Sequence, residues 1–245
     1  MSLDPSLYTW DELKRFGLTL LQPREGYRFT IDPVLLSDFT ALKDEKKVAD
    51  LGTGCGVIAL IMAAMLPDAE VVAVEQDSGM SLLAEENARL NGLGSRLRVI
   101  NDDILNLKSH LPVSSCDLVV SNPPYRKPGM GRLNPDPGRL AGRHETTAKL
   151  ADFLDVAKYL VKPSGRICMV YHIDRLSDLM VEAVRQKLAV LRLRTVHGLP
   201  EFSAKLFLVE MVKDSKNSAL QVMPPLVVRR NENSYTEEVR KILGE

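Results

Sequence analysis

From about residue 43 onward, short apolar runs alternate with segments whose apolar residues recur at helical spacing, and this alternation constrains the fold more than any other feature. It predicts a parallel sheet covered by helices on both faces, so we expect an α/β, Rossmann-like fold. The last two apolar runs are close enough along the chain to pair antiparallel. The expected strands are 47–51, 70–75, 96–100, 117–121, 166–171, 190–196 and 205–212.

The chain has 245 residues, the size of one domain with modest additions. We expect residues 1–42 to form an N-terminal lead-in and residues 43–245 to form a single globular unit. The segment 122–147 separates the fourth strand from the next helix, and a loop of that length is usually functional or disordered. Ser78 is expected to cap the helix after the second strand, and Trp10 is expected to be a packing residue.

Composition excludes several classes of protein. Because 32 basic residues balance 32 acidic ones, a general attraction for polyanions is excluded and nucleic-acid binding would need a local patch. No apolar run reaches the roughly 18 residues of a membrane span, and the N-terminal sequence does not resemble a secretion signal. Cys55, Cys116 and Cys168 are far apart and form no cluster with histidine, which predicts buried thiols, no metal site and a cytoplasmic location. No obligate protein partner is indicated.

A glycine-rich turn follows the first strand and opens a helix. Its glycines permit positive φ and close approach of a ligand to the backbone, and a helix N-terminus favours a carboxylate or phosphate. Glu75 ends the second strand, where its carboxylate can bind both hydroxyls of a ribose, with Gln76 beside it. The candidate cofactor contacts of the turn itself are Asp50, Gly52, Gly54 and Gly56.

Two cofactors fit such a turn. A dinucleotide fingerprint needs a glycine where Val57 stands, and Asp50 would repel a pyrophosphate. The same carboxylate suits a cationic ligand that carries an ammonium and a sulfonium group. The turn therefore favours S-adenosylmethionine over NAD, and a tight turn without a ligand remains the alternative.

Two adjacent acids follow the third strand in the sequence Asp102-Asp103-Ile104. A carboxylate there can accept a hydrogen bond from an adenine amino group, while a backbone N–H meets a ring nitrogen. We favour Asp103, with Ile104 beside it, because it directly precedes the apolar residue. A helix N-cap is the alternative role for either acid.

The sequence Asn122-Pro123-Pro124-Tyr125 follows the fourth strand, and Asn122 is also a candidate contact of the cofactor. Two prolines fix the backbone and leave nearby carbonyls as rigid acceptors. The Asn122 side-chain oxygen and the Pro123 carbonyl can together bind an NH2 group, favour a more tetrahedral nitrogen and direct its lone pair at a methyl donor. Tyr125 can stack on a planar substrate. The alternative is a proline-rich turn that merely ends a strand.

These motifs resemble those of class I methyltransferases that act on amino groups. The segment 27–36, Arg143-His144-Glu145 and the tail 224–239 are similar to the tRNA1(Val) adenine-N6 methyltransferase family, so the resemblance covers nearly the whole chain. It implies a seven-stranded sheet with an antiparallel last strand, S-adenosylmethionine as cofactor, and the adenine beside the anticodon of a valine tRNA as the methyl acceptor. It also implies that the lead-in closes over the methionine end of the cofactor through Arg28, Thr30 and Asp32.

Five basic residues lie close together after the Asn-Pro-Pro-Tyr sequence, against a single acid, Asp136. A local positive charge beside the catalytic turn is what phosphate contacts need in a neutral protein. A solvated loop without a ligand is the alternative, and Arg192, Arg194 and Arg229-Arg230 are weaker candidates to extend the patch. The five residues are Arg126, Lys127, Arg132, Arg139 and Arg143.

Other functions fit the sequence less well. The same chemistry on a guanine N2 of ribosomal RNA or on a protein glutamine remains open, although a glutamine enzyme would need an N-terminal domain for which about 40 residues leave no room. A binding module without catalysis is disfavoured by the intact Asn122, Pro123 and Tyr125. A nicotinamide dehydrogenase fails on the glycine spacing.

Overall fold

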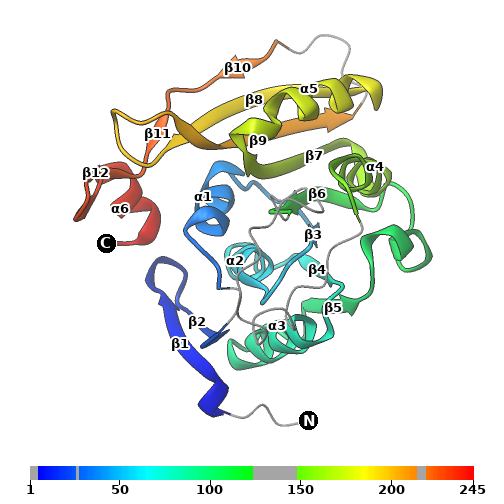
Figure 1. Ribbon diagram of the computed structural model, residues 1–245. Coiled ribbons are helices and arrows are strands. Elements are labelled where there is room, and N and C mark those ends of the chain that lie inside the picture. Colours follow the sequence, from blue (N-terminus) through cyan, green and yellow to red (C-terminus); the bar gives the residue numbers. More distant parts are fainter. Residues whose placement is uncertain (1–4, 26–27, 124–147, 214–218) are drawn as a thin grey trace, which may run out of the picture.

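The computed structural model describes residues 5–25, 28–123, 148–213 and 219–245 (Figure 1). A nine-stranded sheet runs through the molecule in the order β10-β8-β9-β7-β6-β3-β4-β5, and β11 also pairs with β8. Its strands are β3 (Lys47–Leu51), β4 (Glu70–Glu75), β5 (Leu97–Asn101), β6 (Cys116–Ser121), β7 (Val161–His172), β8 (Leu188–His197), β9 (Ala204–Lys213), β10 (Gln221–Val222) and β11 (Leu226–Val227).

Strand directions confirm the predicted fold class. The strands β3 to β7 are mutually parallel, whereas β9 is antiparallel to both of its neighbours, β7 and β8. Seven long strands thus form the expected sheet, and β10 and β11 add short parallel segments along β8. Two of the expected strands, 47–51 and 70–75, have the predicted bounds, and five differ at their ends.

The fifth strand differs most, because β7 begins at Val161 rather than at Arg166. Val161 pairs with Cys116 across an irregularity in the register, and regular pairing with β6 resumes at Arg166. Lys162, Pro163 and Ser164 interrupt the apolar pattern at this point, so the sequence alone hides the start of the strand.

Six helices cover the two faces of the sheet within the described ranges. One face packs against α1 (Asp32–Phe39), α2 (Val57–Met65), α3 (Ser78–Leu90) and α6 (Glu237–Leu243), and the other against α4 (Leu150–Leu160), α5 (Leu176–Arg185) and the 3-10 helix η3 (Ile104–Ser109). The central helix α2 has no polar residue, which suits a helix enclosed by its neighbours. A 3-10 turn η5 (Ile173–Arg175) follows β7, and a small hairpin of β12 (Arg229–Asn231) and β13 (Ser234–Tyr235) precedes α6.

The expected cap of α3 is wrong by one residue. The N-cap is Asp77, whose carboxylate accepts a hydrogen bond of 2.8 Å from the Met80 backbone N–H, and Ser78 is the first residue of the helix. A carboxylate satisfies an N-terminal N–H as a hydroxyl does and also interacts favourably with the helix dipole.

Residues 8–23 of the lead-in form an antiparallel hairpin of β1 (Tyr8–Leu13) and β2 (Leu18–Pro23). The chain turns through the 3-10 helix η2 (Lys14–Phe16) and Gly17, which has a φ of 63°. β2 packs against α2 and α3 and has three buried leucines, whereas β1 lies on the outside. Trp10 belongs to β1 and is 61% exposed, so its expected packing role is wrong.

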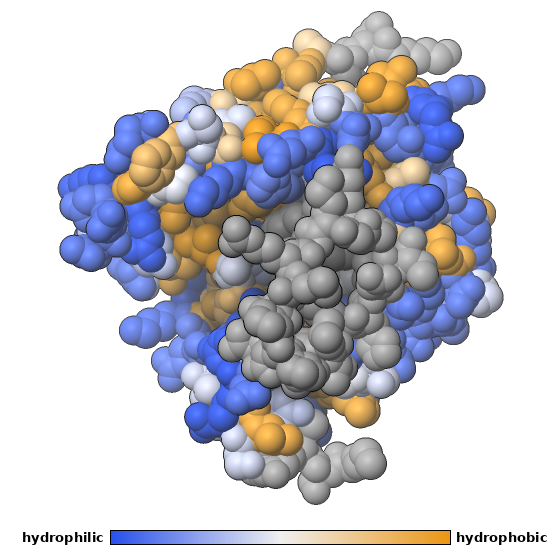
Figure 2. All heavy atoms as spheres, viewed as in Figure 1, coloured by the Kyte–Doolittle hydropathy of each residue, from blue (hydrophilic) through white to orange (hydrophobic). Residues whose placement is uncertain are grey.

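Polar and apolar side chains separate over the surface (Figure 2). In that view, hydrophilic residues cover the lobe that contains α6 and β12, while apolar residues gather over α5 and the β8–β10 end of the sheet. Val181 and Val184 of α5 and Val222 of β10 are among the most exposed apolar side chains. No helix in the described ranges is both long and apolar enough to cross a membrane.

Candidate cofactor and substrate site

The predicted motifs meet at the point where the strand order reverses. From β3 the chain proceeds outward through β4 to β5 and then returns to place β6 on the other side of β3. Leu51, the last residue of β3, pairs with Ser121, the last residue of β6, and Ser121 Oγ donates a hydrogen bond of 2.7 Å to the Leu51 carbonyl. The glycine turn and Asn122 therefore leave the sheet side by side, where ligands bind in open α/β sheets.

The glycine turn adopts a backbone that other residues rarely adopt. Gly52, Gly54 and Gly56 have φ values of 72°, 59° and 92°. The N–H groups of Gly52 and Thr53 both donate to the Val74 carbonyl at 2.9 Å, which fixes the turn to the end of β4. Left-handed φ at three positions in five residues exposes backbone to a ligand without a Cβ in the way.

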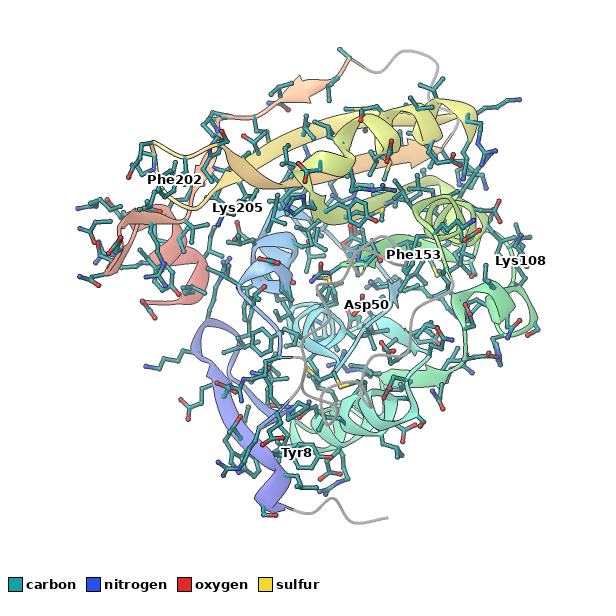
Figure 3. The ribbon with its side chains drawn as sticks, in the orientation of Figure 1. Tyr8, Asp50, Lys108, Phe153, Phe202 and Lys205 are labelled. Atoms are coloured by element: carbon teal, nitrogen blue, oxygen red, sulfur yellow. The ribbon has the colours of Figure 1, made fainter. Side chains whose placement is uncertain are left out.

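Asp50 lies beneath this turn and is fully buried (Figure 3). Its Oδ2 accepts hydrogen bonds from Thr53 Oγ1 at 2.5 Å and from the Ala59 backbone N–H at 3.2 Å, while its Oδ1 is buried without a hydrogen-bond partner in the structure. Burial raises the pKa of Asp50 to about 7, and the nearby Glu75 carboxylate adds to the rise. A buried carboxylate oxygen that lacks a donor is suited to a cationic ligand or a bound water.

Glu75 stands at the end of β4, beside the turn. Its Oε2 accepts a hydrogen bond of 2.8 Å from the Gly54 N–H, and its Oε1 accepts one of 2.9 Å from the Asp77 N–H. Burial raises the pKa of Glu75, and the two backbone hydrogen bonds partly oppose that rise. Because each carboxylate oxygen can accept more than one hydrogen bond, the group keeps acceptor capacity for a ribose. The neighbouring Gln76 is exposed.

The two acids after β5 have different surroundings. The Asp102 carboxylate accepts from Asn106 Nδ2 at 2.8 Å and from the Asp103 N–H, and His110 Nε2 lies 2.7 Å from its Oδ2. Hydrogen bonds from Asn106 and His110 lower the pKa of Asp102. Asp103 caps η3 by accepting from the Leu105 N–H at 3.0 Å, and Ile104 is buried. The N-cap alternative thus describes one contact of Asp103.

Asn122 is half-buried and Pro123 is buried, directly beyond the Ser121–Leu51 pair. Phe153 of α4, labelled in Figure 3, packs close to the turn: its ring would lie 3.6 Å from a Cβ at Gly52. Tyr125, the five basic residues Arg126, Lys127, Arg132, Arg139 and Arg143, and His144 fall outside the described residues, as does most of the predicted loop 122–147.

The segment after the hairpin is held by β1. Arg28 forms an ion pair of 2.9 Å with Asp11 and donates to Thr9 Oγ1 at 2.6 Å, so β1 holds its guanidinium. Thr30 is exposed, and Asp32 begins α1. In the glycine turn, burial raises the pKa of the Cys55 thiol to about 12, and the negative charge of Asp11 adds to that rise.

Three further observations concern candidates from the sequence. Arg192 and Arg194 do not extend a surface patch, because they pair with Glu210 at 2.6 Å and Glu238 at 2.7 Å. The predicted burial of the thiols is confirmed for all three cysteines, which are buried and free. Within the described ranges, no three histidine, cysteine or acidic side chains gather as a metal site would require.

Residues that the sequence analysis missed also shape the site. Asp11 holds Arg28, and Asn87 of α3 donates to the Cys55 carbonyl in the glycine turn at 2.9 Å. Neither has a local sequence signature, since each acts on a segment distant along the chain.

Comparisons with known proteins agree with this geometry. Residues 32–192 match the family described as methyltransferase small domain. A tRNA1(Val) (adenine(37)-N6)-methyltransferase of Porphyromonas gingivalis is 37% identical over 66% of this chain, and the match spans 63% of that relative's length. One of Parabacteroides distasonis is 30% identical over 94% of both chains.

The fold has solved counterparts as well. A predicted O-methyltransferase from Agrobacterium tumefaciens superposes with a TM-score of 0.70, covers 87% of this chain and 95% of its own, and is 21% identical, which shows a shared fold. The family match over residues 32–192, together with the nearly full-length Parabacteroides relative, confirms the resemblance noted in the motifs. The chain belongs to the methyltransferase small domain family, and to the same family as these tRNA1(Val) (adenine(37)-N6)-methyltransferases.

Proposed function

We propose that this protein transfers a methyl group from S-adenosylmethionine to the exocyclic N6 of an adenine in tRNA. The observation that carries the proposal is the Leu51–Ser121 pair, which sets the Asn122–Pro123 segment beside the glycine turn at the switch point of the sheet. The relatives' names support the tRNA substrate and point to the adenine at position 37 of a valine tRNA. Such a substrate places the protein in the cytoplasm.

The residues around the turn fit this cofactor. Asp50 offers a buried carboxylate oxygen with no donor of its own, which suits the positive charge of an amino-acid ammonium group. Glu75 has acceptor capacity for the ribose, with Gln76 beside it, and Gly52, Gly54 and Gly56 let the cofactor lie against backbone. When bound, S-adenosylmethionine supplies an electrophilic methyl group on a positively charged sulfur.

Asp103 is the better candidate to read the adenine of the cofactor. Both oxygens of Asp102 already meet side-chain or backbone partners, through Asn106, His110 and the Asp103 N–H. Asp103 is half-exposed, and Ile104 presents an apolar contact and a backbone N–H next to it. A carboxylate paired with an N–H matches the amino group and ring nitrogen of adenine.

Residues 1–42 are proposed to close over the methionine end of the cofactor. The hairpin holds Arg28 through Asp11 and Thr9, and Thr30 and Asp32 continue that segment into α1. The cationic guanidinium of Arg28 would pair with the cofactor's carboxylate, while residues 43–245 carry the other contacts.

The methyl acceptor is held by this chain's own oxygens. Asn122 Oδ1 and the Pro123 carbonyl accept the two hydrogens of the amino group, so its lone pair turns out of the ring plane and toward the methyl group. Tyr125 stacks on the extruded base, which contributes about 1–3 kcal/mol. The chemistry needs no strong base, because the methylated nitrogen is acidic and releases its proton afterwards. Phosphate contacts come from Arg126, Lys127, Arg132, Arg139 and Arg143.

Incubation with labelled S-adenosylmethionine and total tRNA, followed by digestion to nucleosides, tests the reaction. We expect label in N6-methyladenosine. Label in guanosine, or in protein when a lysate replaces the tRNA, would instead assign the same chemistry to another acceptor.

In the same assay Asn122→Ala should lower kcat by about 100-fold or more and leave cofactor affinity nearly unchanged, because it removes positioning of the acceptor. Equal loss of kcat and cofactor affinity would contradict the role given to Asn122.

A further inference from the structure

One buried amide on α3 joins the glycine turn to the N-terminal hairpin. Asn87 is completely buried, and Nδ2 donates to the Cys55 carbonyl at 2.9 Å and to the Leu21 carbonyl at 3.1 Å. Its Oδ1 accepts from the Leu21 backbone N–H at 2.7 Å. Three hydrogen bonds from a single side chain thus connect three segments that are far apart in the sequence.

A second amide, one helical turn away, binds the hairpin and the end of α3 but not the glycine turn. Asn91 Oδ1 accepts from the Thr19 N–H at 2.9 Å, and its Nδ2 donates to the carbonyls of Thr19 and Asn87, both at 2.7 Å. Asn87 and Asn91 therefore pair with alternate residues of β2, as a neighbouring strand would, because positions four apart lie on the same face of a helix. Only Asn87 also reaches the turn.

The turn rests directly on the same face of α3. A Cβ at Gly56 would lie 3.2 Å from the Cβ of Ala84, which is three residues before Asn87 and shares its face. Gly56 has a φ of 92° and caps α2. The peptide that links Cys55 to Gly56 is therefore fixed on one side by Ala84 and at its carbonyl by Asn87.

The hairpin passes this constraint on to the segment that carries Arg28. Gln22, next to Leu21, is 3% exposed, and it accepts from the Phe29 N–H at 3.0 Å and donates to Asp11 at 2.7 Å. Asp11 in turn holds the Arg28 guanidinium. A path of hydrogen bonds, joined by the peptide link between Leu21 and Gln22, thus runs from the Cys55 carbonyl through Asn87 and β2 to Arg28.

We infer that Asn87 is a positioning residue that couples cofactor binding at the glycine turn to docking of the hairpin 8–23. The inference rests on the proposed placement of the cofactor on that turn. A cofactor that stabilises the turn fixes the Cys55 carbonyl, hence the Asn87 amide, and hence the docked position of β2. Coupling between two equilibria is reciprocal, so a docked hairpin also raises cofactor affinity.

The chemistry of this position requires an amide. The site presents two carbonyl acceptors and one N–H donor, and a short amide supplies the two donors and one acceptor that match them. A carboxylate would keep the bond from the Leu21 N–H and lose both donors. An aliphatic side chain would leave all three backbone groups buried without partners.

The experiment compares Asn87→Ala with Asn91→Ala in the full chain. Both variants remove a paired N–H and carbonyl of β2, but only the first releases the glycine turn. Hydrogen exchange of residues 8–23 is measured with and without S-adenosylhomocysteine, and its dissociation constant is measured by calorimetry. In the wild type and in Asn91→Ala the ligand should slow exchange of the hairpin. In Asn87→Ala it should leave exchange unchanged and bind at least tenfold more weakly.

A second variant guards against simple misfolding. Asn87→Asp keeps the size of the side chain and the acceptor for the Leu21 N–H but removes both donors, so cofactor affinity should remain reduced, and circular dichroism should show that both Asn87 variants keep their secondary structure. The coupling is wrong if both Asn87 variants bind the ligand within twofold of the wild type, or if Asn91→Ala loses the exchange response equally. Glu75→Ala separates the two ideas: if that variant binds normally, the placement of the cofactor is what fails.

Discussion

At the scale of single residues, Asp50 is a carboxyl group that the fold removes from water. Its carboxylate is fully buried, and burial raises its pKa to about 7. Between about pH 4, where the unfolded chain loses this proton, and pH 7, the folded protein binds more protons than the unfolded chain. Stability from this residue therefore falls as pH rises through that window and levels off above it, by a total on the order of 4 kcal/mol.

Replacing the ionisable group should remove this pH dependence. We expect the melting temperature of Asp50→Asn minus that of the wild type to increase from pH 4.5 to pH 7. The wild type loses stability over this range, whereas an amide carries no charge to desolvate. Cofactor affinity should fall in the same variant, since the buried negative charge is lost. Thermal melts across pH and calorimetry check the two parts, and a constant difference in melting temperature would show that Asp50 does not titrate in this range.

Gly56 is constrained by its backbone and by its neighbour together. Its φ is 92°, and an added Cβ would lie 3.2 Å from the Ala84 Cβ. Gly56→Ala should lower the free energy of unfolding by about 2–4 kcal/mol, from left-handed strain plus overpacking, and weaken cofactor binding. Gly92→Ala is the matched control, because Gly92 has a φ of 67° with open space around its missing Cβ. Gly92→Ala should lower the free energy of unfolding by about 1–2 kcal/mol in denaturant titrations. Equal decreases in the two variants would show that the contact between Gly56 and Ala84 does not matter.

At the scale of elements, α1 is anchored by arginines from the sheet. Arg166 of β7 donates to the Thr40 carbonyl at 2.6 Å and pairs with Glu45 and Glu210. Arg192 of β8 donates to the Phe39 carbonyl at 2.9 Å and stacks on its ring. These contacts satisfy carbonyls at the end of α1, which would otherwise lack partners, and they fix the helix whose other end begins at Asp32.

Removal of this anchor should be costly. Arg166→Met leaves the buried Glu45 carboxylate without its arginine and Glu210 with Arg192 alone, and should lower the free energy of unfolding by about 3–5 kcal/mol. Lys46→Met breaks the exposed pair with Asp68 and should cost less than about 1 kcal/mol. Urea titrations of both variants check the contrast. A cost for Arg166→Met as small as that of the surface control would show that the network adds little stability.

Most elements of the sheet could be predicted from the sequence, because local apolar periodicity reports burial directly. The strand 70–75 has its predicted bounds for that reason. The start of β7 could not, because Lys162 and Ser164 are polar and the pairing with β6 is irregular between Val161 and Arg166. The docking of β2 could not either, since it depends on Asn87 and Asn91, whose partners lie about 70 residues away.

The candidate site shows the same division. Glycines at a strand end and the Asn122–Pro123 segment are local signals, and the sheet brings them together as parallel topology requires. Asp11 and Asn87 act across the fold and carry no motif of their own. Arg192 and Arg194 were candidates for a surface patch in the sequence, but in the structure they form ion pairs with Glu210 and Glu238.

At the scale of the whole molecule, charge decides how a neutral protein binds a polyanion. The net formal charge is zero, so affinity for tRNA depends on where the cations lie rather than on their total. The predicted patch follows Asn122 in the sequence, and Asn122 itself comes directly after β6. Association should therefore depend on salt with a slope set by the few cations of that patch.

Charge reversal within the patch tests this distribution. Arg139→Glu should weaken tRNA binding by about tenfold and reduce the slope of log affinity against log salt by about one. Lys187→Glu makes the same change at an exposed position just before β8, at the opposite edge of the sheet, and should have little effect. Filter binding at several salt concentrations measures both, and similar losses in the two variants would show that only total charge matters.

The tail that follows β9 also affects whether molecules of the protein associate with one another in solution. β8 would be the outermost long strand of the sheet, yet β10 and β11 lie along it, joined through Met223 and two consecutive prolines, Pro224 and Pro225. Proline has no N–H to offer an incoming strand, and segments of two residues are too short to template one. A chain that ended near residue 218 would present an open, apolar ladder to its neighbours and would be prone to aggregate through sheet extension, even though every residue of the proposed catalytic apparatus would still be present.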